Sequence, residues 1–153
     1  MTMGHYLAVF SPDTHAAFSR SDRRVMGFRE RHRIAARKVG KGDVLVCYLT
    51  GRSSWVGLLA IDGDVYEDAT PRFAEGEDPF VLRMAVTPIV WLGIDDGVGI
   101  REDEVWSRLS FTREHDKRGS KWTGALRTSL APMKAEDGAL LEAVLRGRLG
   151  STP

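Results

Sequence analysis

Short apolar runs separated by turn-forming residues recur along the chain, and this pattern predicts several β-strands. The run Val44–Leu49 is apolar at every position, as expected of a strand covered on both faces of its sheet. Gly57 lies inside the apolar run that begins at Trp55, which indicates a bulge or a close backbone approach. The predicted strands span residues 6–10, 44–49, 55–61, 80–86 and 89–92, with a short edge strand at 65–66.

Helical spacing appears in four other segments. Ser11 and Pro12 suit the cap and the first position of a helix that continues through Phe18. Residues 28–39 place Ile34 on an inward face at helical spacing, and Gly40 ends that segment. Further helices are predicted at 101–109 and 134–149, and loops at 21–27 and 111–123.

These elements predict the α+β class, with a curved or partly closed β-barrel of five or six strands and three or four outer helices. The chain has 153 residues, which suits a single domain over residues 1–153. An apolar fraction of 42% and a charged fraction of 28% are typical of a globular protein. We expect a cytoplasmic protein without membrane contact, because no long apolar run or secretory signal is present and Cys47 is the single cysteine.

Charge is unevenly distributed, although the net charge is only +1. Nine basic residues face two acids between Arg20 and Lys41, and five face two between Arg113 and Arg127. Residues 62–78 instead hold seven acids and one arginine. Arginine suits phosphate because its planar fork donates two parallel hydrogen bonds. A GC-rich genome would explain the arginine total, but the clustering indicates a nucleic-acid footprint.

Motifs for catalysis or metal binding are missing from the sequence. The four histidines are dispersed without zinc-ligand spacing. Residues 97–99 lack the third glycine of a dinucleotide loop, and residues 40–42 do not continue as a phosphate loop. The acids at 95–96 and 102–104 are best explained as solvated charge in a loop and at a helix start. We therefore expect a binding protein without enzymatic activity, metal or cofactor.

Two tryptophans adjoin polar loops and are candidates to stack on a nucleobase. Trp55 opens a strand directly after a polar turn, and Trp122 follows Lys121 in a basic loop. Stacking on an aromatic side chain contributes roughly 1–3 kcal/mol per base. Burial in the core explains both residues equally well, and it is the better explanation for Trp91 and Trp106.

The order of several weak motifs along the chain is more informative than any one of them. The motifs lie at residues 6–10 (YLAVF), 25–33 (VMGFRERHR), 39–48 (VGKGDVLVCY), 55–57 (WVG), 80–88 and 130–149. In this ordered combination, which covers nearly the whole chain, the sequence resembles the EVE family of the PUA-like superfamily. Relatives of that family include the YTH readers of methylated adenine in RNA.

The resemblance implies a curved β-barrel with a pocket for an extruded, modified base. Bacterial proteins of this kind are similar to readers of methylated cytosine. A flipped base is stacked between flat or apolar side chains and hydrogen-bonded along its Watson–Crick edge. The leading hypothesis is therefore binding to DNA that contains 5-methylcytosine or 5-hydroxymethylcytosine. RNA binding is the first alternative, and binding of a small metabolite or a partner protein is the second.

The resemblance places the pocket entrance at residues 25–28. A related aromatic cage has tryptophan where this chain has Met26, and the softer Met wall argues against methyladenine as the ligand. Phe28 and Tyr48 suit either the pocket or the core, and His32 suits either the base edge or an exposed helix. The predicted base pocket comprises Met26, Gly27, Phe28, His32, Tyr48, Trp55 and Trp122.

Basic residues near these motifs are candidates to hold the phosphates of the strand. Taken singly, each of them is more simply explained as an exposed surface charge. The candidates are Arg29, Arg31, Arg33, Arg118, Lys121 and Arg127.

Overall fold

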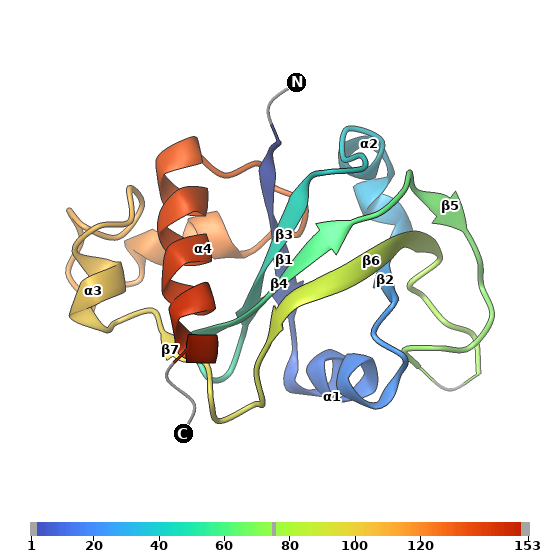
Figure 1. The fold of residues 1–153 in the computed structure, drawn as a ribbon, viewed down its shortest axis with the longest axis horizontal. Coiled ribbons are helices and arrows are strands. Elements are labelled where there is room, and N and C mark those ends of the chain that lie inside the picture. Colours follow the sequence, from blue (N-terminus) through green and yellow to red (C-terminus); the bar gives the residue numbers. More distant parts are fainter. Residues whose placement is uncertain (1–2, 75, 151–153) are drawn as a thin grey trace.

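A mixed β-sheet curls into a half-barrel with helices packed against both of its faces (Figure 1). The structure is a computed structural model that describes residues 3–74 and 76–150. The strands of this part of the chain are β1 (His5–Phe10), β2 (Val25–Phe28), β3 (Val44–Leu49), β4 (Ser54–Ile61), β5 (Tyr66–Glu67), β6 (Leu82–Trp91) and β7 (Val98–Gly99). Its helices are α1 (Pro12–Arg20), η1 (Glu30–His32), α2 (Arg33–Ala36), α3 (Asp103–Trp106), η2 (Lys121–Leu126) and α4 (Ala135–Gly150). The predicted α+β class and partly closed sheet are confirmed.

The strand order places β1 and β2 at the two edges of the sheet. The order is β1-β3-β4-β6-β2, with β5 paired to β6 and β7 paired to β4. β1 and β3 are parallel, whereas β3, β4, β6 and β2 follow one another in antiparallel pairs. β6 serves both halves of the curl, because residues 82–85 pair with β2 and residues 86–91 pair with β4. In the described part of the chain β1 and β2 do not pair with each other, so the half-barrel stays open between them.

A β-bulge interrupts the pairing of β3 with β4. Cys47 pairs with Gly57, but Tyr48 pairs with Trp55, which leaves one extra residue in β4. A Cβ atom on Gly57 would lie 2.7 Å from Cε3 of Trp91, so only glycine fits this approach. Both the bulge and the close approach that Gly57 indicated in the sequence are confirmed.

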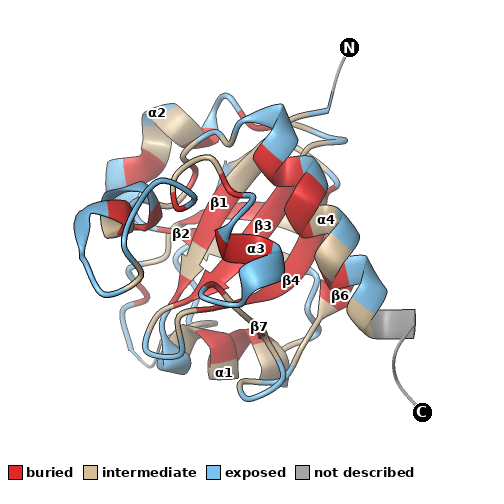
Figure 2. Ribbon diagram, turned by 90° about the vertical axis from the view of Figure 1, so that its left-hand side faces the viewer, coloured by how far each residue is buried: buried red, intermediate tan, exposed pale blue. Residues whose placement is uncertain are grey.

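The two faces of the sheet pack into two separate hydrophobic clusters. Side chains alternate along β3, so Val46 and Tyr48 enter the first cluster while Cys47 and Leu49 enter the second. Helices α3 and α4 cover the first face, as Figure 2 shows, and η2 adds buried side chains to the same cluster. Helices α1 and α2 contribute to the second cluster. The face of the sheet to which a side chain points therefore decides which of the two clusters it joins.

The start of α1 follows the cap predicted from the sequence. Ser11 Oγ accepts a hydrogen bond from the backbone N–H of Thr14 at 3.1 Å. Thr14 Oγ1 in turn accepts one from the N–H of Ser11 at 2.9 Å, and Pro12 occupies the first turn. The long C-terminal helix is also confirmed, as α4. Among the described residues, no helix has both the length and the apolar character needed to cross a membrane.

Several local predictions are wrong. Residues 25–27, predicted as loop, and Phe28, predicted to begin a helix, form the strand β2, because they pair with the first half of β6. The helix predicted over 28–39 shrinks to η1 and α2, and Ile34 is 74% exposed instead of facing inward. The strands predicted at 80–86 and 89–92 form the single strand β6. The helix predicted at 101–109 shortens to α3, and part of the predicted loop 111–123 belongs to η2.

Candidate functional site

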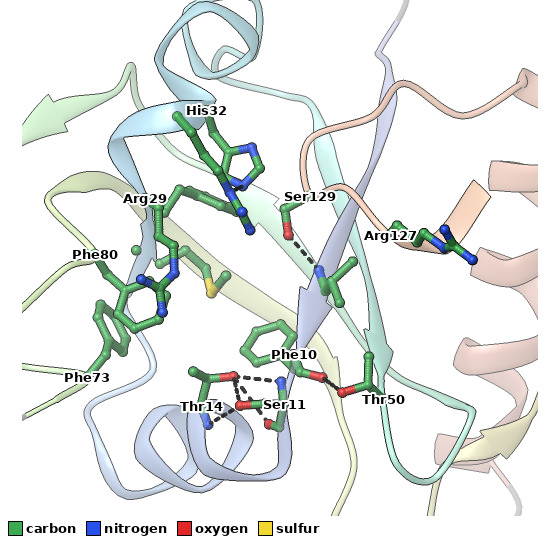
Figure 3. Close-up of a pocket in the computed structure, with 15 residues that line it drawn as sticks. Phe10, Ser11, Thr14, Arg29, His32, Thr50, Phe73, Phe80, Arg127 and Ser129 are labelled. Atoms are coloured by element: carbon green, nitrogen blue, oxygen red, sulfur yellow. Dashed lines mark hydrogen bonds between the residues drawn. The ribbon is translucent and has the colours of Figure 1, made fainter. Parts of the chain in front are cut away.

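A cavity opens between the two edge strands of the half-barrel. β1 contributes Val9 and Phe10, and β2 contributes Met26, Gly27 and Phe28. The cavity has a volume of about 240 Å³. Figure 3 shows side chains converging on it from β1, β2, α1 and neighbouring loops. The region that the sequence marks as the pocket entrance thus lines a recess.

The cavity walls formed by β1 and β2 are apolar and firmly held. Phe10, Met26 and Phe28 are only 3%, 5% and 4% exposed, and all three belong to the second hydrophobic cluster. Their other sides are packed against the core, where side chains sit at close-packed density. These walls can contact a ligand without rearranging.

Two phenylalanines from the segment between β5 and β6 complete the apolar lining. The rings of Phe73 and Phe80 meet edge to face, with centroids 5.9 Å apart and planes at 80°. Gly27 makes room for them, because a Cβ atom there would lie 2.5 Å from Cε2 of Phe73. A glycine inside a strand often marks such a close approach. Gly27 thus admits an aromatic ring to the cavity wall.

A buried arginine holds this segment against the sheet. Arg83 of β6 is 2% exposed, and its guanidinium donates to the carbonyl oxygens of Thr70 at 2.5 Å and Phe80 at 3.2 Å. Asp78 Oδ2 lies 3.3 Å from Nη2 of Arg83 and accepts the backbone N–H of Phe73 at 2.8 Å. Buried charges are stable only when they are paired and hydrogen-bonded. This network therefore fixes the positions of Phe73 and Phe80.

Described residues of the acidic segment 62–78 lie beside the cavity, but the carboxylates of Glu67 and Asp68 are engaged elsewhere. Glu67 accepts a hydrogen bond from Arg33, and Asp68 Oδ2 lies 3.5 Å from Nη1 of Arg83. Among the described residues, no carboxylate lines the cavity. The segment therefore contributes an aromatic ring to the wall rather than negative charge.

Hydroxyl groups from α1, from its N-cap residue and from two loops provide part of the polar lining. They belong to Ser11, Thr14, Thr50 and Ser129. Ser129 Oγ accepts a hydrogen bond from the backbone N–H of Val9 at 2.9 Å, so its own hydrogen can be donated to a ligand. Within residues 3–74 and 76–150, no group of three His, Cys, Asp or Glu side chains is placed to hold a metal ion.

Three exposed arginines stand around the cavity. The guanidinium of Arg29 lies over the ring of Phe80, 4.9 Å from its centroid. Arg31 Nε donates a hydrogen bond to His32 Nε2 at 3.3 Å, and Arg127 lines the opposite side. None of the three forms an ion pair with a carboxylate of the described residues. Their uncompensated charge favours an anionic ligand.

His32 lies against the cavity as a neutral imidazole. Burial lowers its pKa, and the positive charges of Arg31 and Arg29 lower it further. Because Nε2 accepts the hydrogen bond from Arg31, the ring proton is assigned to Nδ1. His32 can therefore hydrogen-bond a ligand without adding positive charge.

The structure brings seven of the predicted site residues to this cavity. They come from β2, from the segment that follows it, and from the chain just after η2. The seven residues are Met26, Gly27, Phe28, Arg29, Arg31, His32 and Arg127. The other six predicted residues lie elsewhere.

Tyr48 and Trp55, which were predicted to line the base pocket, do not line this cavity. Both belong to the first hydrophobic cluster, on the opposite face of the sheet, where their rings meet edge to face with centroids 5.0 Å apart. Trp55 is 0% exposed, so it cannot stack on a ligand. The bulge in β4 turns its side chain to this face.

Trp122, also predicted for the base pocket, does not line this cavity either. Trp122 is 3% exposed and packs edge to face on Trp106, with ring centroids 5.1 Å apart. Its Nε1 donates a hydrogen bond to the carbonyl oxygen of Gly119 at 2.7 Å. A buried indole with a satisfied N–H is a core residue of the first cluster.

Three predicted phosphate contacts lie outside the cavity lining. Arg33 donates hydrogen bonds to the carboxylates of Glu30 and Glu67, which raise its pKa. Its charge is therefore already compensated. Arg118 and Lys121 are exposed before and at the start of η2, away from the lining residues.

Sequence reasoning missed Phe73, Phe80 and the hydroxyl groups of the lining. The sequence does contain a signal for the two phenylalanines, because bulky aromatic residues are unexpected in a segment dominated by acids and turn residues. The hydroxyl-bearing residues give no such signal, because serine and threonine are common in turns and caps.

Solved structures that share this fold include YTH domains. The YTH domain-containing protein Mmi1, solved as a complex with RNA, matches with a TM-score of 0.64 and 10% identity, over 97% of this chain and 87% of that one. The YTH domain of MRB1 from Zygosaccharomyces rouxii, solved with N6-methyladenosine RNA, matches with a TM-score of 0.61 and 10% identity, over 95% and 91% of the two chains. Rpa0253 from Rhodopseudomonas palustris matches with a TM-score of 0.52 and 13% identity, over 99% and 96%.

At these identities the likeness establishes the fold alone, which this chain shares with YTH domains. No protein-family model matches the sequence, and no curated protein matches it either.

Proposed function

We propose that the protein binds nucleic acid through a modified base that leaves its strand and enters the cavity between β1 and β2. The observation that carries this proposal is an apolar, aromatic cavity surrounded by three arginines that have no carboxylate partner among the described residues. The fold adds support, because solved structures that share it include YTH domains in complex with RNA. The proposed role is binding without a reaction of its own, in the cytoplasm.

The size and chemistry of the cavity suit a single base. Its volume of about 240 Å³ lies below the roughly 300–1,000 Å³ of pockets that take drug-sized ligands. The half-buried ring of Phe80 offers a flat surface, and a stacked base gains roughly 1–3 kcal/mol from such a contact. A methyl group that fills the apolar part of the cavity adds on the order of 1 kcal/mol.

The polar groups divide into two roles. His32 and Ser129 lie on the cavity lining, where they can hydrogen-bond the edge of an extruded base. Arg29, Arg31 and Arg127 stand around it, where they can hold phosphates of the strand. Phosphate contacts supply affinity without sequence information, whereas contacts with the base supply the discrimination.

The leading ligand is DNA that contains 5-methylcytosine or 5-hydroxymethylcytosine, as the EVE resemblance implies. Met26 supports this choice over methyladenine, because a thioether offers less stacking surface than the tryptophan of the related cage. RNA that contains N6-methyladenosine is the second candidate, because the MRB1 domain that shares the fold was solved with such RNA.

A binding panel tests the proposal. One oligonucleotide sequence is prepared as DNA and as RNA, single-stranded and paired, with cytosine, 5-methylcytosine, 5-hydroxymethylcytosine, adenine or N6-methyladenine at one position. We expect at least one modified base to bind about tenfold more tightly than its unmodified form. Equal affinity for all of these bases would remove the reader function.

Arginine variants separate the two roles in the same panel. Replacement of Arg29 and Arg31 by Gln should weaken binding to every oligonucleotide and flatten its salt dependence, with the preference for the modified base retained. Arg108→Gln is the matched control, because Arg108 is exposed in a recess between α3 and α4. Affinity that does not change with salt would instead favour a small metabolite or a partner protein as the ligand.

A further inference from the structure

A second recess adjoins the cavity and shares Thr50 and Arg127 with it. It has a volume of about 360 Å³ and lies between the turn after β3 and the segment around η2. Figure 3 shows the side chain of Arg127 extending away from Arg29 and His32, which line the first cavity. The shared residues make the two recesses neighbours rather than separate sites.

The floor of the second recess is rigid and carries a fixed guanidinium. Tyr48 and Trp122 form part of the floor and are almost fully buried. The guanidinium of Arg101 lies over the indole ring of Trp122, 4.9 Å from its centroid, which is a cation–π geometry. Arg101 Nε donates a hydrogen bond to the carbonyl oxygen of Lys117 at 3.2 Å. Both contacts hold the arginine in place while the residue stays exposed.

The charge of this recess is positive and uncompensated. Arg101 and Arg127 both line it, and neither forms an ion pair with a carboxylate of the described residues. No Asp or Glu of residues 3–74 and 76–150 contributes to the lining. Burial raises the pKa of Tyr48, and the nearby Ser53 hydroxyl and Arg101 charge offset this only in part. The Tyr48 phenol therefore stays protonated and can donate a hydrogen bond.

We propose that the second recess holds the phosphate group adjacent to the extruded base, between Arg101 and Arg127. The inference rests on the proposed function and deepens it, because it gives the strand a path from the cavity across Arg127 towards Arg101. Planar guanidinium groups bind phosphate oxygens through parallel hydrogen bonds, and Arg101 is already oriented by Trp122. A ligand with a phosphodiester on this side should bind more tightly than the isolated modified nucleoside.

The test compares two probes on three proteins. The probes are the modified nucleoside preferred in the panel and a single-stranded pentanucleotide with that base at its centre. The proteins are the wild type, Arg101→Gln and the control Arg108→Gln, each measured at several salt concentrations. For Arg101→Gln we expect roughly tenfold weaker binding of the pentanucleotide, a salt slope smaller by about 0.7, and unchanged binding of the nucleoside.

Each other outcome has a distinct meaning. If Arg101→Gln binds the pentanucleotide as the wild type does, the phosphate site is overturned while the base cavity stands. If Arg101→Gln and Arg108→Gln weaken binding equally, the effect is general surface charge and the site is again overturned. If the wild type does not prefer the modified base but Arg101→Gln still weakens pentanucleotide binding, the phosphate site stands and the reader function is overturned.

Discussion

The Nη2 atom of Arg83 lies 3.3 Å from Oδ2 of Asp78, and this buried contact ties β6 to the segment that carries Phe73 and Phe80. Asp78 also accepts the backbone N–H groups of Phe73 and Phe80, at 2.8 and 2.9 Å. One carboxylate thus organises both phenylalanines that this segment contributes to the cavity wall. The cavity depends on an ion pair that does not itself line it.

Loss of this carboxylate should destabilise the protein. Asp78→Ala removes the buried carboxylate beside the Arg83 guanidinium, which keeps only the longer contact with Asp68, and loss of one partner of a buried ion pair typically costs about 3–5 kcal/mol. We expect the free energy of unfolding, measured by urea denaturation, to fall by roughly that amount. Asp64→Ala is the control, because Asp64 is exposed and surface changes usually stay within about 0.5 kcal/mol. Equal stability of the two variants would contradict the structural role of Asp78.

A methyl group on Gly27 should impair both the site and the fold. In Gly27→Ala the new Cβ would lie 2.5 Å from the ring of Phe73 and 2.9 Å from Cβ of Phe80, so the rings must shift. We expect about tenfold weaker binding of the preferred oligonucleotide, because stacking contributes roughly 1–3 kcal/mol per base. Overpacking should also lower the free energy of unfolding by about 1–3 kcal/mol.

Gly63→Ala is the matched control for this substitution, because nothing lies within 4 Å of a Cβ atom at that position. It should leave both the affinity and the urea midpoint unchanged. Full binding by Gly27→Ala would mean that the ring of Phe73 takes no part in recognition.

The central strands could be predicted because their local pattern and their tertiary setting agree. Val44–Leu49 is apolar throughout and is buried at every position, between two hydrophobic clusters. Residues 25–28 show the opposite case. Their sequence contains a glycine and follows a polar, arginine-rich stretch, so only pairing with β6 reveals them as a strand.

The site could be predicted only in part, because one bulge changes which face a side chain occupies. Strict alternation back from Ile61 and Leu59 would put Trp55 in the second cluster, on the side of the cavity. The extra residue opposite the Cys47–Tyr48 step moves Trp55 into the first cluster instead. Gly57 in the sequence indicates a bulge, but it does not indicate which side chain the bulge moves to the other face of the sheet.

Arg83 illustrates a second limit of local pattern. It occupies the middle of an apolar run, where alternation gives it an outward direction. Its burial depends on Thr70 and Asp78 folding back over it, which is a tertiary contact that the local sequence pattern does not encode. The local sequence pattern therefore predicted neither the burial of Arg83 nor the positions of Phe73 and Phe80, which Arg83 helps to hold.

The stability of the protein should depend on pH through His32. Its pKa is lowered in the folded state, first by burial and then by Arg31 and Arg29, so the unfolded chain takes up a proton first as the pH falls. This contribution is complete above the ordinary histidine pKa of about 6.5 and is lost as the pH falls from there through the lower folded pKa. The free energy of unfolding should decrease less between pH 7 and 5 for His32→Gln than for the wild type.

His115→Gln provides the control for this pH dependence, because His115 is exposed in the loop before η2. Its pH profile should follow that of the wild type. If His32→Gln shows the wild-type slope, the imidazole is not held neutral by its surroundings.

Recognition and stability should separate in two aromatic variants that lie on opposite faces of the sheet. Phe80→Leu keeps an apolar group in the half-buried cavity wall but removes the flat ring beneath Arg29. We therefore expect about tenfold weaker oligonucleotide binding, while the free energy of unfolding changes by less than about 1.5 kcal/mol. Trp55→Phe leaves space in the first cluster and should lower the free energy of unfolding by about 1–3 kcal/mol, with the preference for the modified base unchanged. Oligonucleotide titration and urea denaturation of both variants measure the two effects. If instead Trp55→Phe weakened binding and Phe80→Leu lowered stability, the ligand would have to contact Trp55. That result would contradict the structure, in which the Trp55 ring is 0% exposed.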